Sequence, residues 1–99
     1  MAEDPLKVYE KIDPEIRRVV ENFRIFAFKD GALPAKIKIL IAMALDASHG
    51  AAEGVKTLAN LAMKAGATKE EIGETLRVAL FVCGAGSAYT AAYGLKELK

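Results

Sequence analysis

The sequence has little of several residue types on which common protein chemistries depend. It contains no tryptophan, three tyrosines and four phenylalanines, which leaves few side chains to stack on bases or sugars. The single cysteine, Cys83, excludes an intrachain disulfide and a multi-cysteine zinc site. The 14 basic and 13 acidic side chains nearly cancel, for a net charge of +1. This balance gives no basic surface for nucleic acid and no polybasic membrane patch.

Apolar residues, by contrast, are abundant. They make up 53% of the 99 residues, slightly above the usual share of about 45–50%, and this argues against disorder. A chain of this length predicts one domain, residues 1–99. The apolar excess has to be buried, and a subunit interface is the expected place.

No segment of the chain reads as a targeting or membrane signal. Met1-Ala2-Glu3-Asp4-Pro5 is acidic with no apolar run behind it, which does not fit a signal peptide. Residues 78–95 are uncharged and reach the lower limit of bilayer-spanning length, but Gly84-Ala85-Gly86 divides them. We expect two short buried helices there, a cytoplasmic protein and no membrane partner.

Helix signals recur along the chain, and no alternating strand pattern occurs. Asp4-Pro5 and Asp13-Pro14 place a capping carboxylate before a proline at the first helical position, which predicts N-terminal helices over 5–30. Later helices are predicted at about 35–48, after Gly50, after the capping box Thr68-Lys69-Glu70-Glu71, and behind a Ser87 cap. The fold class is therefore all-α, a single domain of about six helices.

Apolar spacing predicts which helix faces are buried. Residues 35–48 are apolar nearly all round, which is typical of a central helix. In the N-terminal region the predicted face consists of Ile16, Val19, Val20 and Phe23, and Phe26 and Phe28 prolong it until Asp30-Gly31. The helix after Gly50 has a face of Val55, Leu58, Ala59 and Ala62. The helix after the capping box has a face of Ile72, Leu76, Ala79, Leu80 and Cys83.

Polar residues gather between the third and fourth predicted helices, where Asp46, Ser48, His49 and Glu53 lie close in sequence. On a continuous helix Asp46, His49 and Glu53 would share one face, where a carboxylate could orient the imidazole for acid–base work. The same three side chains could ligate a metal. Alternatively, Gly50 and Gly54 break the helix and the residues form a structural polar corner.

Three other features have a structural and a functional interpretation. Cys83 lies late in an apolar helix, where a thiol usually acts as a small hydrophobe, although a nearby base would make it a nucleophile. Tyr89 and Tyr93, at i and i+4, more often pack with hydroxyls at a rim than act in catalysis. Gly84-Ala85-Gly86 lacks the preceding strand of a dinucleotide loop and reads as a hinge. No cofactor is predicted beyond the metal alternative.

Several of these motifs together resemble a known family. Lys36-Ile37-Lys38-Ile39-Leu40-Ile41-Ala42 is followed by Ala65-Gly66-Ala67-Thr68-Lys69-Glu70-Glu71-Ile72, then by Glu74-Thr75-Leu76-Arg77-Val78-Ala79 and a small-residue final helix. Over about residues 34–98 the chain resembles the carboxymuconolactone decarboxylase family, which includes the alkyl hydroperoxidase D-like proteins. The resemblance implies an all-α fold, homo-oligomers that are commonly trimers or hexamers, and peroxidase (peroxiredoxin-type) or decarboxylase activity.

The sequence departs from that family at the residues of its chemistry. Hydroperoxidase members carry a Cys-x-x-Cys pair, a histidine and a glutamate that form a proton relay, and these positions correspond to Ala51, Gly54, Leu58 and Ile39 here. The decarboxylases keep the histidine that is Leu58 in this chain. The loss of these residues argues against peroxidase activity by the usual mechanism.

Two functions of different classes follow. The first is a non-thiol site, enzymatic or metal-binding, built on Asp46, His49 and Glu53, with Cys83 or a tyrosine contributing. The second is a non-catalytic oligomeric binding or scaffold protein. The sequence identifies no small-molecule ligand.

Overall fold

The computed structural model describes residues 4–98, and these are helical with short connections. The elements are η1 (Pro5–Val8), α1 (Tyr9–Ile12), α2 (Pro14–Phe28), α3 (Ala35–Ser48), α4 (Ala52–Lys64), α5 (Lys69–Cys83) and α6 (Ala85–Leu95). The all-α prediction of about six helices is confirmed. Met1, Ala2, Glu3 and Lys99 lie outside the described residues. The prediction that the segment of residues 1–5 is not a signal peptide therefore falls mostly outside them.

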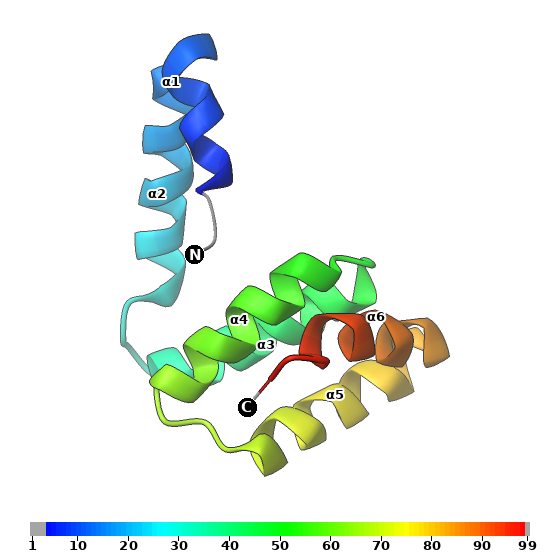
Figure 1. Ribbon diagram of the computed structural model, residues 1–99. Helices are drawn as coiled ribbons and strands as arrows, with labels where there is room; N and C mark the ends of the chain where they lie inside the picture. Colours follow the sequence, from blue (N-terminus) through cyan, green and yellow to red (C-terminus); the bar gives the residue numbers. More distant parts are fainter. Residues whose placement is uncertain (1–3, 99) are drawn as a thin grey trace.

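The helices form two parts, a four-helix bundle and an N-terminal arm (Figure 1). In the bundle, α3 contacts α4, α5 and α6, and α6 also packs on α4 and α5, so the prediction of a central helix over 35–48 is confirmed. The arm is the hairpin of η1 and α1 against α2, and it projects away from the bundle. Among residues 4–98, no helix is long and apolar enough to cross a membrane.

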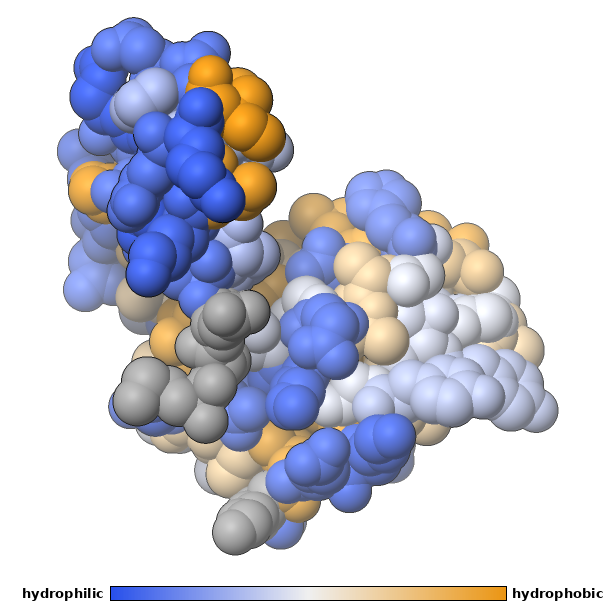
Figure 2. All heavy atoms as spheres, turned by 45° about the horizontal axis from the view of Figure 1, so that its top comes forward, coloured by the Kyte–Doolittle hydropathy of each residue, from blue (hydrophilic) through white to orange (hydrophobic). Residues whose placement is uncertain are grey.

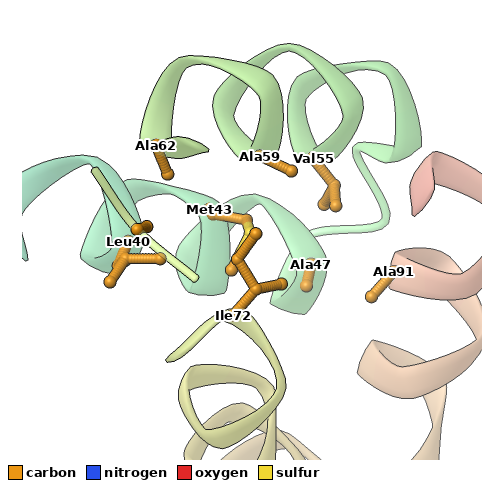
Figure 3. Packing of buried hydrophobic residues seen from close by; sticks show 9 residues of the cluster. Leu40, Met43, Ala47, Val55, Ala59, Ala62, Ile72 and Ala91 are labelled. Carbon is orange, nitrogen blue, oxygen red and sulfur yellow. The ribbon is translucent and has the colours of Figure 1, made fainter. Parts of the chain in front are cut away.

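The bundle core is built largely from small side chains, which point toward one another from α3, α4, α5 and α6 (Figure 3). Six of the ten buried hydrophobic residues described are alanines: Ala47, Ala59, Ala62, Ala67, Ala79 and Ala91. The helices consequently approach closely. At Gly94 in α6, an added Cβ would come within 2.5 Å of the Ala52 carbonyl oxygen.

Local capping follows the sequence signals at three helix starts. Asp4 and Asp13 accept hydrogen bonds from the amides of Leu6 and Glu15. Thr68 and Glu71 form the reciprocal capping box at the start of α5. The hydrogen bond from the Thr68 amide, followed by one from the Lys36 ammonium, lowers the pKa of the Glu71 carboxyl below its ordinary value.

Ion pairs join the helices of the arm, which has no buried core. Arg17 pairs with Asp4, with Glu10 at 3.6 Å and with Glu21 at 3.1 Å. The hydrogen bond to Glu21 is the main cause of a raised pKa of the Arg17 guanidinium. None of η1, α1 and α2 contains a buried residue.

Several predictions of burial and capping are wrong for this chain. The α2 face with Ile16 and Phe23 is exposed, because the arm stands off the bundle. Leu80 and Cys83 are also exposed, since the last turns of α5 extend beyond its packed part. Ser87 does not cap α6: the helix begins at Ala85, and the buried Ser87 hydroxyl donates to the Gly84 carbonyl at 2.8 Å.

Candidate functional site

An open pocket with a volume of about 990 Å³ lies between the arm and the bundle. The arm and the connection that follows it contribute Pro5, Arg24, Ile25, Phe28 and Lys29. The bundle contributes Ile39, Asp46, Glu53, Gly54, Thr57, Leu58 and Leu61, from α3 and α4. The pocket therefore exists only because the two parts of the chain are held at an angle to one another.

Two hydrogen bonds form at the connection between α2 and α3. The Ala35 amide donates to Asp30 Oδ1 at 2.6 Å, which satisfies one of the free amides at the start of α3. The Lys38 ammonium donates to the Lys29 carbonyl at 2.7 Å. The sequence predicts that Asp30-Gly31 ends the preceding helix, but α2 already ends at Phe28. The Asp30 carboxylate instead accepts a hydrogen bond at the start of α3.

Asp46 lies in the last turn of α3, half-buried, with its carboxylate against α4. The contact is at Gly54, where an added Cβ would lie 2.0 Å from Asp46 Oδ2 and 2.7 Å from Cγ. The missing side chain of Gly54 is what gives this carboxylate its space. Gly54 lies within α4 and does not break that helix.

The turn between α3 and α4 separates His49 from the pocket. α3 ends at Ser48, Gly50 has a φ of +77°, and the Ala51 amide returns to the Asp46 carbonyl at 2.9 Å. Asp46, His49 and Glu53 therefore do not lie on one continuous helix. His49 is exposed and does not line the pocket, whereas Asp46 and Glu53 do.

The metal alternative finds no ligand cluster in the structure. Among residues 4–98, no three His, Cys, Asp or Glu side chains are arranged to hold a metal ion. Asp46 and Glu53 are the acidic groups of the pocket, and two carboxylates fall short of the ligand set expected from the sequence. The Ser48 hydroxyl is used locally, since it donates to the Leu45 carbonyl at 2.6 Å.

The charges of the pocket are divided between its two walls. Asp46 and Glu53 belong to the bundle wall, and Arg24 and Lys29 belong to the arm wall. The apolar side chains of Ile25, Phe28, Ile39, Leu58 and Leu61 complete the lining. A site of this kind suits an organic molecule with an apolar body and polar ends.

Three of the four positions that the family resemblance assigns to a relay line this pocket. Ile39, Gly54 and Leu58 are all lining residues, and none of them carries a group that can titrate. The fourth position, Ala51, precedes α4 as its N-cap. The pocket thus lies where the resemblance places the family's relay, and the carboxylates that line it are those of Asp46 and Glu53.

The remaining candidates lie elsewhere. Cys83 is an exposed free thiol at the end of α5, and Tyr89 and Tyr93 are exposed on α6, with 71% and 69% of their surface accessible. None of the three lines the pocket. The structure does not bring Cys83 or either tyrosine to Asp46.

The sequence did not anticipate the arm residues as part of a site, although it placed Phe28 on an apolar surface. Ile25 lies on the side of α2 opposite Ile16 and Phe23. Arg24 and Phe28 lie between these two sides. Because Ile25 is apolar but lies off the main apolar face, its position weakly indicates a second contact of α2. The connection that brings Ile25 near α4 follows a path that has no sequence signature.

Comparisons with known proteins agree with the all-α fold. The carboxymuconolactone decarboxylase family matches residues 14–97, so the match begins within the arm instead of at residue 34. A solved structure, the apo form of a carboxymuconolactone decarboxylase family protein from Legionella pneumophila, is 35% identical with a TM-score of 0.85. The alignment covers 92% of this chain and 81% of that one. No curated protein matches the chain.

Proposed function

The chain belongs to the carboxymuconolactone decarboxylase family, and from this premise we propose that it binds a small organic molecule in the pocket between arm and bundle and acts on it without thiol chemistry. Asp46 is the principal acid–base group, and Glu53 is the second. The observation that supports this most directly is the placement of both carboxylates in the pocket that also contains the family's relay positions, Ile39, Gly54 and Leu58.

The lining suggests which molecules fit. The carboxylate of Asp46 accepts a hydrogen bond or a proton from an amine or hydroxyl group. The apolar residues of both walls surround the body of the ligand, while Arg24 and Lys29 favour a negative group at the other end. We therefore infer a ligand with a donor group that meets Asp46.

The test is a binding titration with three probes of one size and different polar groups: phenylethylamine, phenylethanol and phenylacetate. The titration is followed by NMR chemical shifts. Of the three probes, the amine is expected to move the resonances of α3 and α4 around Asp46 most strongly. A hydrogen bond to a charged group is worth about 1.5–3 kcal/mol, so Asp46→Asn weakens amine binding about tenfold or more.

His49→Ala is the matched control, because His49 is near Asp46 in sequence but outside the pocket. It is expected to leave binding of all three probes unchanged. Loss of amine binding in His49→Ala with retention in Asp46→Asn would overturn the proposal.

A second candidate is a non-catalytic binding or scaffold protein, which the exposed apolar residues of α2 and α5 favour. As a scaffold, the protein would leave the pocket unsaturated by any of the probes, and Asp46→Asn would behave like the wild type. The titration therefore separates a ligand-binding pocket from a scaffold, and turnover of a bound ligand separates an enzyme from a binding protein.

A further inference from the structure

Thr57 carries the only uncharged hydrogen-bonding side chain among the described residues that line the pocket between arm and bundle. It lies in the middle of α4, at an exposed position. A hydroxyl both donates and accepts hydrogen bonds, whereas a carboxylate only accepts and the side chains of Arg24 and Lys29 only donate. Thr57 therefore offers the pocket a kind of contact that its charged residues do not.

The Thr57 hydroxyl is not used by its own helix. Two other hydroxyls of the bundle are: Ser48 donates to the Leu45 carbonyl at 2.6 Å, and Thr75 donates to the Glu71 carbonyl at 2.7 Å. Such a bond to the preceding turn is the common way in which a helix satisfies a hydroxyl. Among residues 4–98 the Thr57 hydroxyl forms no hydrogen bond of this or another kind, so it is available to a ligand.

Thr57 lies about one helical turn from the Asp46 carboxylate. Asp46 Oδ2 occupies the place where a side chain of Gly54 would begin. Positions three residues apart on a helix, such as Gly54 and Thr57, have their Cβ atoms about 5–6 Å from one another. The carboxylate and the hydroxyl are thus too far apart for a hydrogen bond of about 2.8 Å, but one small molecule can bond to both.

The polar and apolar groups of the bundle wall follow one order along α4. The Asp46 carboxylate lies at Gly54, the hydroxyl follows at Thr57, and the apolar side chains of Leu58 and Leu61 continue toward the end of the helix. In Figure 2 the arm stands away from the bundle, so a ligand can enter the open pocket from solvent. A ligand that lies along α4 therefore meets a carboxylate, a hydroxyl and an apolar surface in this order.

We propose that the ligand of this pocket is an amino alcohol, with its amine and its hydroxyl on adjacent carbon atoms and an apolar group on the carbon that bears the hydroxyl. The amine bonds to Asp46, the hydroxyl bonds to Thr57, and the apolar group packs on Leu58 and Leu61. Adjacent carbons suit the site, because two hydrogen bonds fill most of the distance between Asp46 and Thr57. The inference rests on the proposed function, from which it takes the amine at Asp46, and it makes Thr57 the residue that determines specificity.

The test uses the two enantiomers of 2-amino-1-phenylethanol, which differ only in the side on which the hydroxyl lies. Their binding is followed by NMR chemical shifts. Because the three contacts have fixed places on one wall, the wild type is expected to bind one enantiomer about two- to tenfold more tightly than the other, as one neutral hydrogen bond implies. Thr57→Val replaces the hydroxyl by a methyl group and is expected to bind both enantiomers equally.

Further variants separate the hydroxyl from other effects of the substitution. Thr57→Ser keeps the hydroxyl without the methyl group and is expected to keep the preference for one enantiomer. Thr75→Val makes the same change on α5, where the hydroxyl bonds to the Glu71 carbonyl outside the pocket, and should bind both enantiomers like the wild type. If Thr57→Val loses its helical circular dichroism, Thr57→Ala takes its place, since alanine also lacks the hydroxyl and favours a helix.

The possible outcomes separate this inference from the proposed function. Equal binding of the enantiomers by the wild type, or a preference that survives in Thr57→Val, overturns the inference. If Asp46→Asn still weakens phenylethylamine binding in that case, the proposed function stands and only the role of Thr57 is wrong. If neither phenylethylamine nor either enantiomer binds to the wild type, the proposed function fails, and the amino alcohol fails with it.

Discussion

The carboxylate of Asp46 lies directly over Gly54, so close that a Cβ on this glycine would come within 2.0 Å of Oδ2. At this contact α4 contributes no side chain, and the Asp46 side chain of α3 takes the space. The relationship links a residue without functional groups to the orientation of a carboxylate that lines the pocket.

Gly54→Ala is therefore expected to turn the Asp46 carboxylate out of its place and to weaken amine-probe binding as much as Asp46→Asn does. The measurement is the same NMR titration. Gly73→Ala is the control, because a Cβ at Gly73 meets nothing within 4 Å. That control should leave binding unchanged and raise the free energy of unfolding by about 0.5–1 kcal/mol. Full amine affinity in Gly54→Ala would contradict the role given to Asp46.

A second glycine sets the distance between α4 and α6. At Gly94 a Cβ would lie 2.5 Å from the Ala52 carbonyl oxygen and 2.9 Å from Val55 Cβ, and neither the backbone nor a β-branched residue can move cheaply. We expect Gly94→Ala to lower the free energy of unfolding by about 1–3 kcal/mol, measured by urea denaturation. Gly86→Ala in the same helix has no atom within 4 Å of its Cβ and should lose none of that stability.

The Glu71 carboxylate makes stability depend on pH in the acid range. Its pKa is lowered from the ordinary value of 4.5, first by the Thr68 amide and then by Lys36. A lowered pKa in the folded state means that the contribution is complete above the unfolded value and is lost as the pH falls through the folded value. Glu71→Gln keeps the capping-box hydrogen bond but cannot titrate.

We therefore expect the wild type to exceed Glu71→Gln in stability at neutral pH and the difference to shrink below about pH 4.5. Urea denaturation of both proteins between pH 7 and pH 3 measures this. A difference that stays constant over that range would show that the Glu71 charge does not contribute.

Cys83 is expected to take no part in turnover of the pocket ligand. Its thiol is exposed at the end of α5 and does not line the pocket, so Cys83→Ser should bind the three probes like the wild type. The wild type should also fail to reduce organic hydroperoxides with a dithiol donor. Peroxide turnover that disappears in Cys83→Ser would contradict the thiol-free proposal.

Sequence signals predict the helices of this protein well, because those signals are local. A carboxylate before a proline, as at Asp13, and the reciprocal box of Thr68 and Glu71 act within one turn of the chain. The fold class, the central helix over 35–48 and the family follow from patterns of this kind.

Burial is predicted less well, because periodicity identifies an apolar face without identifying what covers it. The face with Phe23 and the C-terminal end of the predicted face of α5 both have helical apolar spacing, yet Phe23, Leu80 and Cys83 are exposed in this chain. The packed face of α4, with Val55 and Ala59, has the same kind of pattern and is buried. The difference depends on tertiary structure.

The candidate site was predicted in part. Asp46 and Glu53 do share a pocket, but His49 lies outside it because the positive φ of Gly50 turns the chain between α3 and α4. Arg24 lines the pocket because of the angle between arm and bundle. Gly50 marks the turn in the sequence, whereas the angle between arm and bundle has no pattern that a sequence displays in advance.

The alanine-rich interior of the bundle has a consequence for how this protein tolerates mutation. In a core of leucine and phenylalanine, most damage comes from the deletion of atoms, and the cavity that remains sets the cost. At Ala47, Ala59, Ala62 and Ala91, which are 0–2% exposed, a mutation removes at most a methyl group, whereas almost every change adds volume. Harmful variation in this bundle should therefore consist mainly of small-to-large replacements, which push the helices apart.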